Sequence, residues 1–297
     1  MSAAGLGLGL TSVTPLLSYA GNGTRQLTIL HTNDTHARID PFPENASRYA
    51  GLGGVARRAS LVGRIRAENP NVLLLDAGDV FQGTPYFNYY KGALDFKVMS
   101  QMGYDASTPG NHEFDNGIDG FVEVAGEAEF PFVNANYDFG TSPMADYVKE
   151  NIVRDVDGIK VGIFGLGINF DGLVLPALHE GVAYRHPVRL AQYQANRLRY
   201  DYKCDLVVCL SHLGYNYENP ARVDDVTVAT QTRGIDLIIG GHTHTFMDAP
   251  ERIRKDDGSV TIISQVGFAG IVLGRIDFEF NRRREVVRAT AANHTVS

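Results

Sequence analysis

The sequence has little cysteine, no excess of positive charge and no long apolar run. Its 297 residues contain two cysteines, and 27 lysines and arginines stand against 34 aspartates and glutamates, which leaves a net charge of −7. Without a basic excess, sequence-independent binding to a nucleic-acid polymer is disfavoured. After residue 20 no stretch reaches the roughly 18 consecutive apolar residues of a membrane span, so no transmembrane span is expected.

The two cysteines, Cys204 and Cys209, lie five residues apart in the apolar run CDLVVC. An odd offset places side chains on opposite faces of a strand, so we expect no disulfide between them. Both are expected to be buried thiols that pack as small hydrophobic side chains. The rest of the composition, 44% hydrophobic and 21% charged, is ordinary for a globular protein. We therefore expect one large α/β domain with a sizeable core.

The first 20 residues, MSAAGLGLGLTSVTPLLSYA, carry no charged side chain and end in the small-x-small pattern Ser18-Tyr19-Ala20. This pattern is typical of an export signal, although the basic segment that normally precedes the apolar stretch is missing. We therefore expect residues 1–25 to be a truncated export signal and linker, and the mature protein to be periplasmic or attached to the cell surface. The alternative is an apolar tail on a cytoplasmic protein.

Apolar strands alternate with helical patterns along the first 240 residues. We expect strands at QLTILHT, NVLLL, residues 104–108, GIKVGIFGLG, CDLVVCL and IDLIIGG, and helices within residues 51–69, 87–102, 118–128, 187–202 and 223–233. The dipeptide Asp157-Gly158 predicts a hairpin turn within residues 151–167. Residues 258–280 are expected to form only strands. This order of elements indicates an α/β fold.

Metal-competent side chains gather in five short blocks, each directly after a predicted strand. Five of the nine histidines fall in these blocks, a concentration that scattered surface histidines would not show. Loops after strand ends are where α/β folds place their chemistry. The blocks are Asp34-x-His36, Gly78-Asp79, Gly110-Asn111-His112-Glu113, Ser211-His212 and Gly240-Gly241-His242-x-His244.

The residue types in these blocks indicate which ions would bind. Residues i and i+2 of an extended segment share a face, so Asp34 with His36, and His242 with His244, can each converge on one centre, with Asp79 as the natural bridge. Asp, Asn and His without thiolate favour Mn²⁺, Fe²⁺, Co²⁺ or Zn²⁺. Seven candidate ligands suit two ions with open positions better than a closed structural site, and such a pair suits phosphate ester hydrolysis.

The blocks LHTNDTHARI, DAGDVFQGTP, PGNHEFDNG, SHLGY and IIGGHTHT resemble those of calcineurin-like metallophosphoesterases, specifically the N-terminal catalytic domain of the 5′-nucleotidase branch, over residues 27–280. The resemblance implies that residues 26–297 form a metallophosphoesterase catalytic domain with a four-layer α/β/β/α sandwich. It also implies that Asp34, His36 and His244 hold a first ion, that Asp79 bridges, that Asn111, His212 and His242 hold a second ion, and that His112 and Asp115 are the catalytic pair.

This resemblance implies two-metal hydrolysis of phosphate monoesters, above all 5′-nucleotides, by a metal-bound hydroxide. His112 would contact the phosphoryl group, and Asp115 would orient His112 and favour its imidazolium form. The alternatives are a phosphodiester, nucleotide-sugar or sulfur-ester hydrolase with the same fold, or a metal-binding subunit without activity of its own. Relatives that act on nucleotides carry a C-terminal domain that recognises the base, so we expect either a separately encoded C-terminal nucleotidase domain as partner or broad specificity.

The segment after Asp79 is rich in aromatic residues. Two interpretations stay open for this segment: contact with substrate or a partner, and ordinary core packing at a helix start. The aromatic residues are Phe81, Tyr86, Phe87, Tyr89 and Tyr90.

Overall fold

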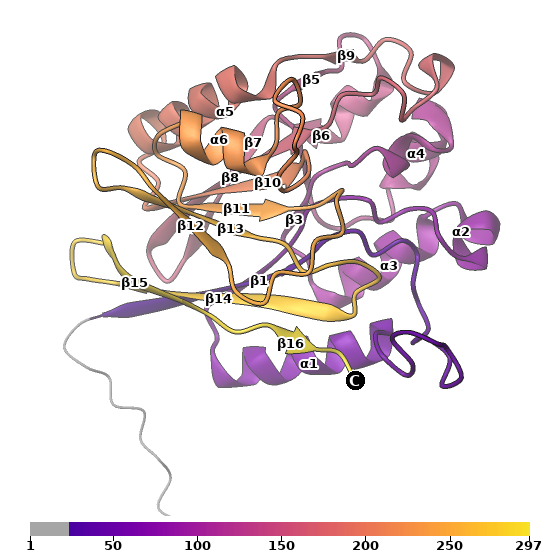
Figure 1. Ribbon diagram of the computed structural model, residues 1–297, viewed down its shortest axis with the longest axis horizontal. Coiled ribbons are helices and arrows are strands. Elements are labelled where there is room, and N and C mark those ends of the chain that lie inside the picture. Colours follow the sequence, from indigo (N-terminus) through magenta and orange to yellow (C-terminus); the bar gives the residue numbers. More distant parts are fainter. Residues whose placement is uncertain (1–23) are drawn as a thin grey trace, which may run out of the picture.

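The computed structural model describes residues 24–297 (Figure 1). Two sheets pack face to face, and helices cover the outer side of each sheet, which gives the four layers of an α/β/β/α sandwich. The predicted fold class is therefore confirmed. The export signal expected at the N-terminus lies outside the described residues, and the first strand begins at Arg25. Within residues 24–297, no helix combines the length and the apolar character needed to cross a membrane.

The first sheet has the order β15-β14-β1-β2-β3-β4-β6, with β16 also paired to β14. β1, β2, β3, β4 and β6 run parallel to one another, whereas β14 is antiparallel to β1 and β15. The strands are β1 (Arg25–Thr32), β2 (Val72–Asp76), β3 (Ala106–Ser107), β4 (Phe132–Val133), β6 (Val148–Lys149), β14 (Val272–Phe280), β15 (Val286–Ala291) and β16 (His294–Thr295).

The second sheet has the order β12-β13-β11-β10-β8-β7, and its four central strands are parallel. The predicted hairpin between β7 and β8 is confirmed, because Asp157 and Gly158 form its turn with positive φ angles of 53° and 77°. The strands are β7 (Asn151–Val156), β8 (Ile159–Gly167), β10 (Leu206–His212), β11 (Leu237–Gly240), β12 (Glu251–Arg254) and β13 (Val260–Ser264); β5 (Tyr137–Asp138) pairs with β9 (Ala183–Tyr184) separately.

Six α-helices flank the sheets in the described part of the chain. The first sheet is covered by α1 (Val55–Glu68), α2 (Pro85–Tyr90), α3 (Ala93–Met102) and α4 (Gly117–Ala125), and the second by α5 (Pro187–Asn196) and α6 (Asp225–Gln231). The single helix predicted over residues 87–102 is wrong, since Lys91 and Gly92 adopt left-handed conformations that separate α2 from α3. The helix predicted over residues 187–202 continues after α5 as a π-helical turn, Arg197–Asp201.

Buried side chains fill three layers between the sheets and helices. In β10, Val208 faces the layer between the sheets, whereas Val207 and Cys209 face α5 and α6. Cys204 and Cys209 are free and buried, but Cys204 precedes β10 and packs in the same layer as Cys209. The expectation of opposite faces was therefore wrong, because only Cys209 belongs to the strand.

The carboxyl ends of the parallel strands position the five blocks. The block with Asp34 follows β1, that with Asp79 follows β2, and that with His112 follows β3. His212 ends β10, and His242 comes two residues after β11. Because the two sheets are stacked, strand ends that are far apart in sequence meet at one edge of the sandwich.

Candidate metal centre

Six metal-competent side chains form two compact clusters at this edge. Within each cluster, one ligand atom from each residue lies within 4.8 Å of the others. Each cluster draws on loops from both sheets, so the site depends on how the sheets are stacked. The first cluster comprises Asp34, His36 and His244, and the second comprises Asp79, His212 and His242.

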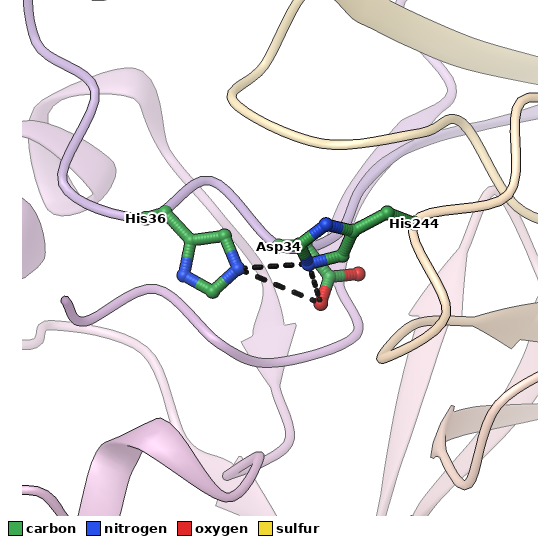
Figure 2. Close-up of side chains that lie close together, drawn as sticks. All are labelled: Asp34, His36 and His244. Carbon is green, nitrogen blue, oxygen red and sulfur yellow. Dashed lines mark hydrogen bonds and ion pairs between the residues drawn. The ribbon is translucent and has the colours of Figure 1, made fainter. Parts of the chain in front are cut away.

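The first cluster points three donor atoms at one region of space (Figure 2). The Nε2 atoms of His36 and His244 are 2.9 Å apart, and Oδ1 of Asp34 lies 3.3 Å from His244 Nε2 and 4.0 Å from His36 Nε2. Ligand atoms bound to one ion at about 2.1 Å are roughly 3 Å apart in neighbouring positions and at most about 4.2 Å apart in opposite positions, so distances of 2.9 to 4.0 Å fit a divalent ion. Nδ1 of His36 bonds to the carbonyl oxygen of Phe81 at 3.0 Å, which leaves Nε2 free to bind.

The second cluster is the more deeply buried one. Nε2 of His212 lies 2.9 Å from Oδ2 of Asp79, and it makes no hydrogen bond of acceptable geometry within the described chain. A buried ring nitrogen that lies beside a carboxylate and has no hydrogen-bond partner is suited to coordinate an ion. Nδ1 of His212 is held 2.6 Å from the carbonyl oxygen of Ala77. Asn111 joins the cluster, with Oδ1 2.9 Å from Nδ1 of His242.

Asp34 connects the two clusters. Its Oδ1 lies 3.9 Å from Nε2 of His212, in addition to its approach to the histidines of the first cluster. The predicted ligands are thus all brought together. The bridging role assigned to Asp79 stays a prediction.

The electrostatics of the clusters combine one buried ion pair with two neutral imidazoles. Burial by itself would raise the pKa of the Asp79 carboxyl, but the charge of His212 holds it well below its usual range, so Asp79 is ionised at neutral pH. Burial opposes protonation of His212, yet the Asp79 carboxylate raises the pKa of His212 to about 10, so an ion bound at Nε2 would displace a proton. Burial lowers the pKa of His36, and it lowers that of His242 to about 4, so both imidazoles are neutral, the form that binds metals.

The backbone at the clusters is strained. Non-glycine residues rarely adopt positive φ angles, which cost on the order of 1–3 kcal/mol each and concentrate at functional sites. Of the six cluster residues, all but His212 have such angles, between 50° and 71°. The assumption of extended i, i+2 pairs was therefore wrong in its geometry, although each pair does converge. The strained residues are Asp34, His36, Asp79, His242 and His244.

His112 and Asp115 lie beside the clusters, on a short 3₁₀ turn (His112–Phe114) and the residue that follows it. Nδ1 of His112 is 2.9 Å from Oδ2 of Asp115, and its ring is 5.4 Å from that of His36. The backbone N–H of His112 donates to Oδ1 of Asp79 at 2.8 Å. Burial opposes protonation of His112, but the bond to Asp115 raises its pKa overall. His112 and Asp115 thus form a hydrogen-bonded pair beside the two clusters, and their catalytic role stays a prediction.

Sequence reasoning assigned no role to Glu113, which organises the loops of the second cluster. Its buried carboxylate accepts hydrogen bonds from the backbone N–H groups of Asp79 (2.9 Å), Val80 (2.7 Å), Phe81 (3.1 Å) and Gly110 (2.5 Å). Burial, followed by the charge of Asp79, raises the pKa of Glu113 to about 7. The sequence feature that could have indicated a role for Glu113 is its position inside the block Gly110-Asn111-His112-Glu113.

Asn33 is a second residue without a predicted role. Its Nδ2 donates to Oδ2 of Asp34 and to the carbonyl oxygen of Gly267, both at 2.6 Å, and its Oδ1 accepts from the N–H of Val266 at 3.0 Å. These bonds tie Asp34 to a loop that begins 233 residues after Asn33 in the chain. No sequence pattern indicates such a distant contact.

The aromatic residues after Asp79 divide between the two interpretations. Phe81 and Phe87 are buried in the core. Tyr86, Tyr89 and Tyr90 line a surface cavity of about 640 Å³ next to the loop that follows His36. Core packing is therefore confirmed for the phenylalanines, whereas contact of the tyrosines with substrate or a partner stays a prediction.

Comparison with known proteins agrees with this geometry. The sequence profile of the calcineurin-like phosphoesterases matches residues 27–246. The chain belongs to that family. A trifunctional nucleotide phosphoesterase protein of Bacillus subtilis, YfkN, is 34% identical over 93% of this chain and 19% of its own length, and the human 5′-nucleotidase is 33% identical over 89% of this chain and 48% of its own length.

The crystal structure of a 5′-nucleotidase precursor from Thermus thermophilus superposes with a TM-score of 0.81 at 32% identity, and covers 92% of this chain and 55% of the other. The chain thus spans about half or less of the length of these relatives. The predicted resemblance to the 5′-nucleotidase catalytic domain, and the assignment to metal-dependent phosphoester hydrolases, are confirmed at the level of the family.

Proposed function

We propose that this chain hydrolyses phosphate monoesters, above all 5′-nucleotides, with two divalent ions. The observation that carries this proposal is the convergence of two Asp/His clusters on one edge of the sandwich, with Asp34 within reach of both. Two ions held close together are an arrangement suited to phosphate ester hydrolysis. The names of the 5′-nucleotidase relatives support nucleotides as the substrate class.

The residues of the two clusters and the pair His112 and Asp115 would have different roles in this reaction. When bound, two divalent ions supply an activated water and neutralise charge on the phosphoryl oxygens. Asp34, His36 and His244 would hold one ion, Asn111, His212 and His242 would hold the other, and Asp79 would bridge the two. His112, whose Nδ1 is engaged by Asp115, presents Nε2 as a donor to a phosphoryl or leaving-group oxygen. Asp115 fixes the tautomer and orientation of His112 and stabilises its protonated form.

The test is phosphate release from AMP and from an aryl phosphate. Metal-stripped protein receives Mn²⁺, Zn²⁺, Co²⁺ or Fe²⁺ singly, and Asp34→Asn serves as the matched site variant. We expect metal-dependent turnover of AMP well above that of the aryl ester, and a loss of at least about a hundredfold in the variant. Absence of turnover of either monoester with every ion would overturn the proposal, and profiling of phosphodiesters, nucleotide-sugars and sulfur esters would then identify the bond cleaved.

A second candidate is a catalytic domain that needs a further domain for substrate selection. The observation that favours it is that the match covers 19% of the Bacillus protein and 48% of the human enzyme, so these relatives carry further sequence that could select the substrate. A separately encoded C-terminal nucleotidase domain would then recognise the base. Slow, similar turnover of AMP and the aryl ester would favour this candidate over an autonomous nucleotidase.

We also propose that residues 1–20 direct export to the periplasm or the cell surface. The uncharged apolar segment and its small-x-small end support this proposal. A fusion of residues 1–25 to a reporter that is active only after export should give activity. A silent fusion that accumulates in the cytoplasm would contradict it.

A further inference from the structure

His244 differs from other histidines of the two clusters in how its ring is held. The second ring nitrogens of His36 and His212 bond to backbone carbonyls, which fixes their orientation. Nδ1 of His244 has no hydrogen-bond partner within residues 24–297, and 40% of its side chain is exposed. An exposed side chain whose ring is not held would lose rotamer freedom when it binds an ion, and this loss of entropy would weaken binding. The loss is smaller if another group already holds the ring.

The ring of Phe268 takes the place of that hydrogen bond. It stacks on the imidazole of His244 with a centroid distance of 5.2 Å and an interplanar angle of 14°. Such a contact confines the imidazole to one plane, while its nitrogens stay free. In this orientation Nε2 of His244 points toward Asp34 and His36 (Figure 2), and the plane of the imidazole is the one that stacks on Phe268.

Phe268 is itself held by aromatic neighbours. Tyr49, Phe246 and Phe42 meet its ring edge to face, with centroid distances of 5.6, 5.9 and 6.4 Å. Edge-to-face contacts at such distances are favourable and restrict ring rotation. The face that stacks on His244 is thus fixed before any ion binds.

The backbone around Phe268 is tied to both segments that carry the first cluster. The N–H of Ala269 donates to the carbonyl oxygen of Asp34 at 2.7 Å, and the N–H of Gly267 donates to that of Thr245 at 2.9 Å. Because Thr245 follows His244 directly, Phe268 sits between two chain segments at a fixed distance from both ligands.

We propose that Phe268 is a positioning residue that holds the imidazole of His244 in its ligating orientation and thereby sets the affinity of the first cluster for its ion. This inference rests on the two-ion assignment made above. Groups that orient a metal ligand contribute about 10- to 100-fold to metal affinity. Because a single stacking contact holds the ring of His244, the effect expected for Phe268 is at the lower end of this range, about tenfold.

The test is a metal titration of stripped protein, with Mn²⁺ or Zn²⁺ in competition with a chelating dye. Phe268→Leu should weaken one of the two binding steps about tenfold and leave the other within about twofold, whereas Phe268→Tyr, which keeps the ring, should restore wild-type binding. Phe246→Leu is the matched control, because its ring contacts Phe268 and Tyr49 but not His244. Because Phe42 and Tyr49 still hold the ring of Phe268 in this variant, both binding steps should stay within about twofold of wild type.

A thermodynamic cycle separates positioning from general packing. In a His244→Ala background, Phe268→Leu should have no further effect on either step. Three results would each overturn the inference while the two-ion assignment stands. Phe246→Leu could weaken binding as much as Phe268→Leu does, Phe268→Leu could have its full effect in the His244→Ala background, or Phe268→Leu alone could leave binding unchanged. Failure of the wild-type protein to bind two ions would overturn the assignment and the inference together.

Discussion

The imidazole of His112 and the carboxylate of Asp115 face each other across one turn, with Nδ1 2.9 Å from Oδ2. Neither residue belongs to the two clusters, so both can be changed without removal of a metal ligand. We expect His112→Ala to lower kcat by about 10²–10⁴-fold and Asp115→Asn by about 10–100-fold, because the second variant keeps the imidazole but loses its orienting charge. The measurement is kcat for phosphate release at saturating metal.

The pH profile gives an independent check of the same pair. Burial disfavours the imidazolium of His112, but Asp115, together with Asp79 and Glu113, more than compensates, so the pKa of His112 is raised and the ring stays protonated to higher pH. Asp115→Asn should therefore move the alkaline limb of the profile to lower pH. If both variants lost bound metal in parallel with activity, the pair would be part of the metal site instead.

Glu113 holds together the loops of Asp79 and Asn111 through four backbone hydrogen bonds. Glu113→Gln replaces one acceptor oxygen by an NH₂ group and so leaves buried N–H groups without an acceptor. Each such group lowers the stability of the folded protein by about 1–3 kcal/mol. We expect the free energy of unfolding to fall by about 3 kcal/mol in urea, and metal affinity to fall with it.

The matched control is Glu127→Gln, whose carboxylate forms an exposed ion pair with Lys97 at 3.3 Å. Its effect should stay below about 1 kcal/mol. Unfolding of Glu113→Gln at the wild-type urea concentration would show that the loops are held by other contacts.

Local patterns were sufficient for the alternation of strands and helices and for the candidate ligands at strand ends, whereas the four-layer arrangement followed from the resemblance to a known family. Apolar runs that end in Asp, Asn or His place the ligands at strand ends, and stacked parallel strands bring those ends together. The predictions of secondary structure that were wrong concern elements whose limits depend on contacts with residues elsewhere in the chain. The break at Gly92 is one example, since a Cβ there would overlap the ring of Phe81. The edge strand β15 escaped prediction because Val286 and Val287 are exposed and show no buried alternation.

Asp95 makes the stability of the protein depend on pH. Burial in α3 raises the pKa of this carboxyl to about 7 from its ordinary 3.8, and one of its oxygens has no hydrogen-bond partner within the described residues. The folded state binds the proton more tightly than the unfolded one, so its contribution to stability is full below about pH 4 and is lost as pH rises toward 7.

Asp95→Asn removes this dependence. The variant should match the wild type near pH 4 and exceed its free energy of unfolding at pH 8 by up to about 4 kcal/mol. Urea unfolding at both pH values measures the difference, with Asp256→Asn, on an exposed turn, as the control. An advantage of equal size at both pH values would show that ionisation of Asp95 is not its source.

At Gly165 in β8 the two sheets are so close that residue 165 has no room for a side chain. A Cβ at this position would overlap the carbonyl oxygen of Val133 in β4, and the N–H of Ala135 donates to the carbonyl oxygen of Gly165 at 2.9 Å. Gly165→Ala should therefore lower the free energy of unfolding by about 2–3 kcal/mol, since overpacking forces the sheets apart.

Gly126, at the end of α4, is the matched control for that substitution. It has a φ of −65°, and no atom lies within 4 Å of the point that a Cβ would occupy, so Gly126→Ala should be neutral or stabilising by up to about 1 kcal/mol. Both variants lose the same glycine entropy in the unfolded chain, so the difference between them isolates the steric cost at the sheet crossing. Equal stabilities would mean that β8 can move away from β4 without loss of packing, which the backbone hydrogen bond of Ala135 opposes.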